Sequence, residues 1–89
     1  MDKVIDIEVT SMKEVDFSGL KFPQIVLYRN PDDDPEVCVA RVFDNGCPTN
    51  VMMRRETIWE LQYDINIHTN MVFVSRCKED LPAIAGMYF

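Results

Sequence analysis

TIWELQYDINIH, residues 57–68, is the stretch of this chain whose pattern most clearly predicts a helix, and the remaining segments are arranged around it. Thr57 is suited to accept a hydrogen bond from the amide three residues on, and Glu60 is suited to reach back to the amide of Thr57. This capping box places the start of the helix at Thr57. Asn70 is expected to end the helix, because asparagine tolerates the left-handed conformation in which many helices stop.

One side of the predicted helix is aliphatic. Ile58, Leu61 and Ile65 recur at helical spacing and predict that this side packs on a core. Trp59 and Tyr63 are four residues apart and therefore share a side as well. Either they extend the buried side, with Trp59 at its edge, or they form an aromatic anchor at an interface. Because both rings would widen the buried arc, we expect one of them near its rim, and both are candidate partner-binding residues.

The segments before and after the helix have the alternating or strongly apolar pattern of strands. Asp44-Asn45-Gly46 predicts a tight turn, so the three central segments are expected to form an antiparallel meander. Arg54 and Arg55 lead into the helix start, where cations are unfavourable, and are expected to pair with Asp or Glu. The expected strands are Lys3–Val9, Gln24–Arg29, Val37–Phe43, Thr49–Met53 and Met71–Ser75.

The middle strand of the meander has two different sides. Cys38, Ala40 and Val42 form a side of small residues, while Arg41 and Phe43 belong to a bulkier side. Small residues suit the face on which a helix lies close, so we place the helix over the small side. The bulkier side is expected to need a cover from the N-terminal segment, the C-terminal tail or a second protomer.

Two further segments complete the predicted domain. Residues 10–21 lose the alternation and are expected to form a short helical turn or a loop anchored on the core. The apolar tail Leu81–Phe89 either joins the sheet or packs on a partner. The whole order predicts one α+β domain over residues 1–89. It is expected to be a two-layer sandwich, with an antiparallel sheet of four to five strands and one main helix on one face.

Composition narrows the classes of function. Nine Lys and Arg stand against 15 Asp and Glu, a formal charge of −6. This argues against direct nucleic-acid or anionic-membrane binding, since attraction to phosphate supplies such affinity. The charge is compatible with a basic protein partner, and also with a charge that only maintains solubility. No apolar run approaches the roughly 20 residues of a membrane span, and three cysteines without CxxC spacing indicate reduced thiols and a cytoplasmic setting.

The most conspicuous charged feature is an acidic loop made of Asp32, Asp33, Asp34 and Glu36. Such a run is typical of a solvated loop, and it also suits a patch whose carboxylates imitate phosphates toward a basic groove. A metal site is disfavoured, because a calcium loop needs ligands at alternate positions and a glycine at its turn. The four residues are therefore candidate partner-binding residues, and no metal is predicted.

No pattern typical of an enzyme or of a cofactor site is present. His68, the only histidine, is expected to cap the helix or lie on the surface, since no serine or cysteine stands near it as a nucleophile. Cys38 is expected in the core and Cys47 near the surface. Cys77 lies between two basic residues, which would lower the pKa of an accessible thiol, so it is the cysteine to test for reactivity.

About half of the chain forms a recognisable order of segments, Ile25–Arg29, Val37–Phe43, Asn50–Met53 and Thr57–Ile65. This order resembles the HicB antitoxin fold, a partial RNase-H-like sheet with one packed helix. The resemblance implies a protein that neutralises an RNA-cutting partner, without the separate DNA-binding region of that family. The chain also resembles small uncharacterised proteins of Gram-positive bacteria and their mobile elements, through Tyr28-Arg29-Asn30-Pro31, Asp33, Pro35, Val39-Ala40-Arg41 and Phe43-Asp44.

These features together favour a small acidic, non-enzymatic, cytoplasmic binding protein. We expect it to inhibit or neutralise a basic, nucleic-acid-handling protein, as antitoxins and phage-encoded inhibitors such as anti-CRISPR proteins do. The alternative is a self-associating structural module, a homodimer formed through the apolar tail or the second face of the sheet.

Overall fold

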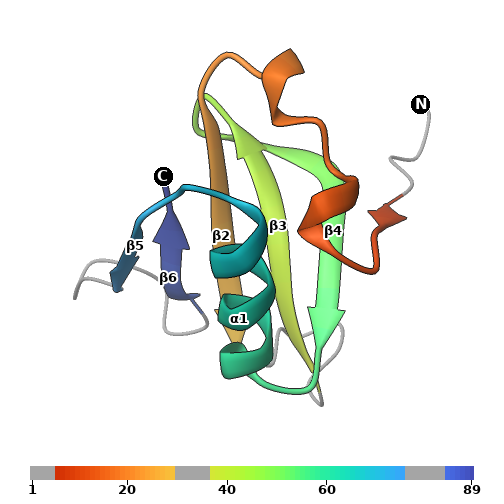
Figure 1. The fold of residues 1–89 in the computed structure, drawn as a ribbon, viewed down its shortest axis with the longest axis vertical. Coiled ribbons are helices and arrows are strands. Elements are labelled where there is room, and N and C mark those ends of the chain that lie inside the picture. The colour runs from red at the N-terminus through yellow and green to blue at the C-terminus, as the bar shows by residue number, and fades with distance from the viewer. Residues whose placement is uncertain (1–5, 30–36, 76–83) are drawn as a thin grey trace.

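The computed structural model describes residues 6–29, 37–75 and 84–89, which form one mixed six-stranded sheet with an α-helix across one face (Figure 1). The meander predicted from the sequence lies inside this sheet, where β2 (Pro23–Arg29), β3 (Cys38–Asp44) and β4 (Cys47–Arg55) pair antiparallel. At the turn after β3, Asn45 and Gly46 have φ angles of 53° and 80°, the positive values that a two-residue hairpin loop needs. The predicted turn and meander are confirmed.

The outer strands correct the prediction in number and direction. β1 (Ile7–Glu8) is parallel to β4, and β6 (Ile84–Tyr88) is antiparallel to both β2 and β5 (Phe73–Ser75). The strand order is therefore β1-β4-β3-β2-β6-β5, in place of four to five antiparallel strands. A parallel pair needs a long crossover, and the segments between β1 and β4 provide one. Residues 3–5 of the expected first strand lie outside the described residues.

The C-terminal tail is part of the sheet from Ile84 onward. Tyr88 is fully buried, and its ring centroid lies 5.2 Å from that of Phe73 on β5. Gly86 makes this close packing feasible, since a Cβ atom there would lie 2.5 Å from the Phe73 ring. Of the two alternatives for the tail, joining the sheet is confirmed, while residues 81–83 lie outside the described residues.

The helix α1 (Ile58–His68) begins after Thr57 and ends at His68, as the predicted stretch 57–68 does, but the manner in which it ends differs from the prediction. The amide of Glu60 donates to the Thr57 hydroxyl, and the Glu60 carboxylate accepts from the Thr57 amide, both at 3.2 Å. The expected stop at Asn70 is wrong. Thr69 ends the helix in an extended conformation, and its amide and its hydroxyl both donate to the Ile65 carbonyl, at 2.9 and 2.8 Å. These two donors satisfy the carbonyl without a left-handed residue.

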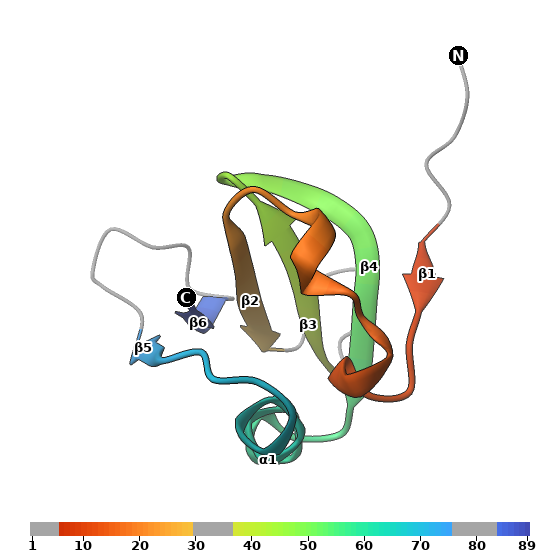
Figure 2. The same cartoon turned by 45° about the horizontal axis from the view of Figure 1, so that its top comes forward.

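The core lies between α1 and one face of the sheet, hereafter the covered face. Cys38, Ala40 and Val42 are buried there against Leu61 and Ile65, as the small-residue pattern of β3 predicted. Two 3₁₀ helices, η1 (Met12–Glu14) and η2 (Phe17–Gly19), lie on this same face (Figure 2); η1 contacts α1, and η2 lies farther from it along the sheet. The N-terminal segment therefore extends the cover that α1 provides.

A buried carboxylate joins the N-terminal segment to α1. Asp64 accepts hydrogen bonds from the Ser11 hydroxyl at 2.7 Å and from the Met12 amide at 2.8 Å. Arg55 and His68 approach the same carboxylate at 4.0 and 3.9 Å. The pairing expected for Arg55 is confirmed, and His68 lies at the exposed helix end, in agreement with its predicted role.

The opposite face of the sheet, hereafter the open face, carries ion pairs. The Arg41 guanidinium donates to both carboxylate oxygens of Asp6, at 2.9 and 3.2 Å, and Arg54 lies 3.3 Å from Glu8. These contacts fasten β1 to β3 and β4. The N-terminal helices lie on the covered face and the tail is a strand within the sheet. Three apolar side chains that share the face of Arg41 are nevertheless only 5%, 7% and 3% exposed, those of Val26, Val39 and Met52.

Candidate protein-binding surface

The outer side of α1 carries a line of large exposed side chains. Trp59, Tyr63 and Ile67 are 70%, 58% and 57% exposed, and their spacing of four residues places them along one side of the helix. Leu61 and Ile65 occupy the other side and are fully buried. We call Trp59, Tyr63 and Ile67 the aromatic stripe. Single exposed apolar residues are ordinary, but a contiguous line of them typically marks an interaction site.

The two rings of the stripe are already arranged for binding. The centroids of Trp59 and Tyr63 lie 5.9 Å apart, with ring planes inclined by 20°, so the rings stack. Stacking restricts the side-chain torsions before a partner arrives, which lowers the entropy lost on association. Aromatic side chains of this kind supply most of the energy at many interfaces.

Of the two alternatives left open for Trp59 and Tyr63, a place on the buried side of the helix is wrong, and the role of an interface anchor stays a prediction. Neither ring belongs to the buried side, and Trp59 lies well outside the edge where the aliphatic pattern placed it. Sequence reasoning missed Ile67, although its position four residues after Tyr63 continues the same line. Apolar residues occur on two sides of α1, so the sequence alone allows either side to pack on the core. The packing in the structure shows which side is buried.

The electrostatic surroundings of the stripe are acidic. Glu56 and Glu60 lie before and within the first turn of α1, and the helix contains no Lys or Arg. Arg41 and Arg54 are on the open face of the sheet, where they pair with Asp6 and Glu8. Arg55 contacts the buried Asp64 and the Thr10 carbonyl, on the side of α1 that faces the N-terminal segment. The stripe is therefore apolar with negative neighbours, which suits a partner surface that presents cations around an apolar centre.

The structure brings together two of the six predicted partner-binding residues, Trp59 and Tyr63. The other four, Asp32, Asp33, Asp34 and Glu36, lie outside the described residues, and so does Cys77. Cys38 is buried in the core and Cys47 is exposed, both as free thiols.

Within the described part of the chain, no group of three or more His, Cys, Asp or Glu side chains is placed to hold a metal ion. The same part contains no helix with the length and apolar character needed to cross a membrane. Ser11, Asp64 and His68 are neighbours, but the serine hydroxyl donates to the aspartate, so the histidine is not placed as a base for it.

Comparison with known protein families, with curated proteins and with solved structures gives no match to this chain. The resemblance to HicB antitoxins therefore stays a prediction.

Proposed function

We propose that this chain is a non-enzymatic binding protein that uses the aromatic stripe of α1 to bind and inhibit a basic, nucleic-acid-handling protein. The observation that carries the proposal is the exposed, stacked pair Trp59 and Tyr63. The resemblance to antitoxins favours the same class of function, and phage-encoded inhibitors such as anti-CRISPR proteins belong to it as well.

The charge of the chain favours a basic protein over nucleic acid as the partner. With a formal charge of −6, the chain repels phosphate and attracts a surface that binds phosphate. Such a surface on a nucleic-acid-handling enzyme is positively charged. A small acidic domain that anchors beside it through Trp59 and Tyr63 excludes the nucleic acid by occupying its place, and needs no chemistry of its own.

The test compares three forms of the protein as bait in a lysate of the native host. These are the wild type, the double variant Trp59→Ala/Tyr63→Ala, and the control Phe22→Ala, which removes an aromatic side chain that is 56% exposed outside α1. A protein captured by the wild type and the control but lost with the double variant is then purified and titrated. We expect a loss of affinity of about 30-fold or more, the size of a hot-spot truncation, and weaker binding in high salt.

Two further measurements test whether binding of this chain inhibits the partner and whether the acidic loop contributes to the affinity of the complex. The partner's nucleic-acid binding should fall with added wild type and recover with the double variant. Reversing the charges of Asp32, Asp33, Asp34 and Glu36 should weaken the complex, and unchanged affinity would remove the loop from the interface. Equal affinity of the wild type and the double variant would refute the role of the stripe.

A second candidate function is self-association, and exposed apolar residues at the β5 edge of the sheet favour it. Val72, Val74 and Phe89 are 67%, 46% and 46% exposed, and β5 is an edge strand whose outer side can add a strand from a second copy. Because β6 lies between β2 and β5, removing the tail would disrupt the sheet itself. The sharper test is Val74→Lys: sedimentation should show a dimer for the wild type and a monomer for the variant. A wild type that stays monomeric at high concentration would exclude this function.

A further inference from the structure

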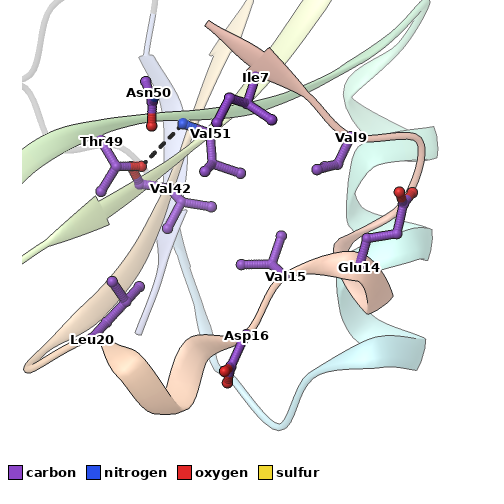
Figure 3. A pocket seen from close by; sticks show the side chains of 10 residues that line it. All are labelled: Ile7, Val9, Glu14, Val15, Asp16, Leu20, Val42, Thr49, Asn50 and Val51. Carbon is purple, nitrogen blue, oxygen red and sulfur yellow. Dashed lines mark hydrogen bonds between the residues drawn. The ribbon is translucent and has the colours of Figure 1, made fainter.

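A groove opens on the covered face of the sheet, between the N-terminal helices and the strands β1 and β4 (Figure 3). Its volume is about 420 Å³, within the range of roughly 300–1,000 Å³ that small-molecule sites occupy. Branched aliphatic side chains line it and, in Figure 3, surround a common open space. They are Ile7, Val9, Val15, Leu20, Val42 and Val51.

The uncharged polar groups of the lining are already engaged within the protein. The Thr49 hydroxyl donates to the Val42 carbonyl at 2.7 Å and accepts from the Val51 amide at 3.2 Å. Asn50 also interacts with another residue. The interior of the groove therefore offers an occupant apolar contact rather than neutral hydrogen-bonding groups.

The charged groups of the lining are two carboxylates. Glu14 Oε2 accepts from the Thr10 hydroxyl and from the amides of Thr10 and Ser11, and Asp16 Oδ1 accepts from the Ser18 hydroxyl and amide. These hydrogen bonds, first of all those from the Thr10 and Ser18 hydroxyls, lower the pKa of each carboxyl, so both are ionised at neutral pH.

One oxygen of each carboxylate accepts the hydrogen bonds that cap a 3₁₀ helix. The other oxygen, Oε1 in Glu14 and Oδ2 in Asp16, accepts no hydrogen bond from the described residues. No Lys or Arg is among the described residues that line the groove. The groove thus combines an apolar interior with a negative rim that has acceptor positions to spare.

We propose that this groove binds an apolar organic cation, an amine that carries an alkyl chain or a small ring. The hydrocarbon part lies among Val9, Val15 and Val51, and the ammonium group meets the Glu14 carboxylate at the rim. The Asp16 carboxylate points away from the open space in Figure 3 and adds only its charge. A carboxylate-headed ligand of the same shape is repelled by the rim. This site is separate from the aromatic stripe, so the inference does not rest on the proposed function.

Three probes with the same chain length separate the contributions of charge and hydrocarbon. Octylammonium, 1-octanol and octanoate are titrated separately into the ¹⁵N-labelled full chain, below micelle formation, and followed by amide chemical shifts. We expect the affinity to fall in that order, with shifts centred on Val15 and Val51 and with contacts from the ligand methyl group to Val42. Octanoate binding as tightly as octylammonium, or shifts centred on α1, would overturn the proposal.

Charge-neutral variants test the rim without disturbing the caps. Glu14→Gln keeps a residue type that preserves the capping box of η1, and should lower octylammonium affinity about three-fold, the effect of losing an exposed ion pair, while leaving octanol affinity unchanged. Asp16→Asn, which removes a charge that points away from the groove, should have a smaller effect. The matched control is Glu60→Gln, the same change in the capping box of α1. An equal effect of the control would refute a specific role of the rim.

Discussion

The two faces of the sheet are stabilised by different interactions. On the covered face, α1 and η1 bury Leu61, Ile65 and Met12 against the strands, and the carboxylate of Asp64 is buried with its donors. On the open face, the contacts that hold β1 are ion pairs with half-exposed carboxylates, such as Arg41 with Asp6. Apolar burial and buried hydrogen bonds stabilise a domain by several kcal/mol per site, whereas exposed ion pairs give about 0 to 1 kcal/mol.

This difference separates the residues that contribute most to the stability of the domain from the exposed residues that are available for binding. The main cluster of buried side chains lies on the covered face, and the outer side of the helix that covers it carries the aromatic stripe. The stripe can therefore change freely without loss of the fold, because none of its three residues belongs to the buried core.

The strongest test of the comparison is a truncation on each side of α1. Leu61→Ala removes a fully buried side chain and should lower the free energy of unfolding by about 3 to 4 kcal/mol, through lost burial and the cavity left behind. Tyr63→Ala, on the outer side, should change it by about 0.5 kcal/mol or less. Chemical denaturation measures both, and similar losses would show that the stripe is packed.

The next test compares the buried junction between η1 and α1 with the exposed capping box of α1. Asp64→Ala leaves the Ser11 hydroxyl and the Met12 amide without their buried acceptor and should cost about 2 to 3 kcal/mol. Thr57→Ala disrupts the exposed capping box of α1 and should cost about 1 kcal/mol. If denaturation shows the two variants to be equally stable, the junction between η1 and α1 contributes less than its geometry indicates.

A third test adds a single methyl group under the Phe73 ring. Gly86→Ala places a Cβ atom 2.5 Å from that ring and 2.7 Å from the Val74 carbonyl oxygen, and should destabilise the domain by about 2 kcal/mol through overpacking. Gly19→Ala, where no atom lies within 4 Å of an added Cβ, serves as the control and should be close to neutral. Thermal unfolding of both variants checks whether the β5–β6 pair shares the packing of the covered face.

The smallest expected effect is on the open face and depends on pH. The hydrogen bond from Arg41 lowers the pKa of Asp6 below its ordinary value of 3.8, so the unfolded chain takes up the proton first as the pH falls. The pair therefore stabilises the fold above that value and loses its contribution as the pH falls through the lowered pKa. Relative to Asp6→Asn, the wild type should be more stable by about 0.5 kcal/mol near neutral pH, and less so in high salt.

The measurement for this pair is denaturant unfolding of both proteins along a pH series. The difference between them should shrink toward zero at the acid end. A difference that stays constant with pH would show that Asp6 contributes through packing rather than charge.

Local signals in the chain account for much of the fold. The meander, the turn at Asn45 and Gly46 and the capping box of Thr57 and Glu60 depend on neighbours a few residues apart, so they were readable from the chain. The second capping box, Ser11 with Glu14, has the same spacing and was overlooked, although the pattern is present in the sequence. It marks the start of η1, in a segment for which a short helical turn was one of the two expectations.

Other features depend on partners far apart in the chain. The burial of Asp64 follows from Ser11 and Met12, more than 50 residues earlier, and nothing in the helix itself distinguishes this aspartate from an exposed one. The candidate site shows the same limit: residue spacing placed Trp59 and Tyr63 on one side of α1, but their exposure depends on which side the sheet occupies.

Periodicity and capping chemistry determined an α+β domain with one helix over a small-residue strand, because these are interactions between near neighbours. Tertiary packing alone decided the parallel pairing of β1, the insertion of β6 between β2 and β5, and the direction in which the aromatic stripe faces. Each of these depends on competition between surfaces distant in the chain for the same apolar contacts, and only the folded arrangement settles that competition.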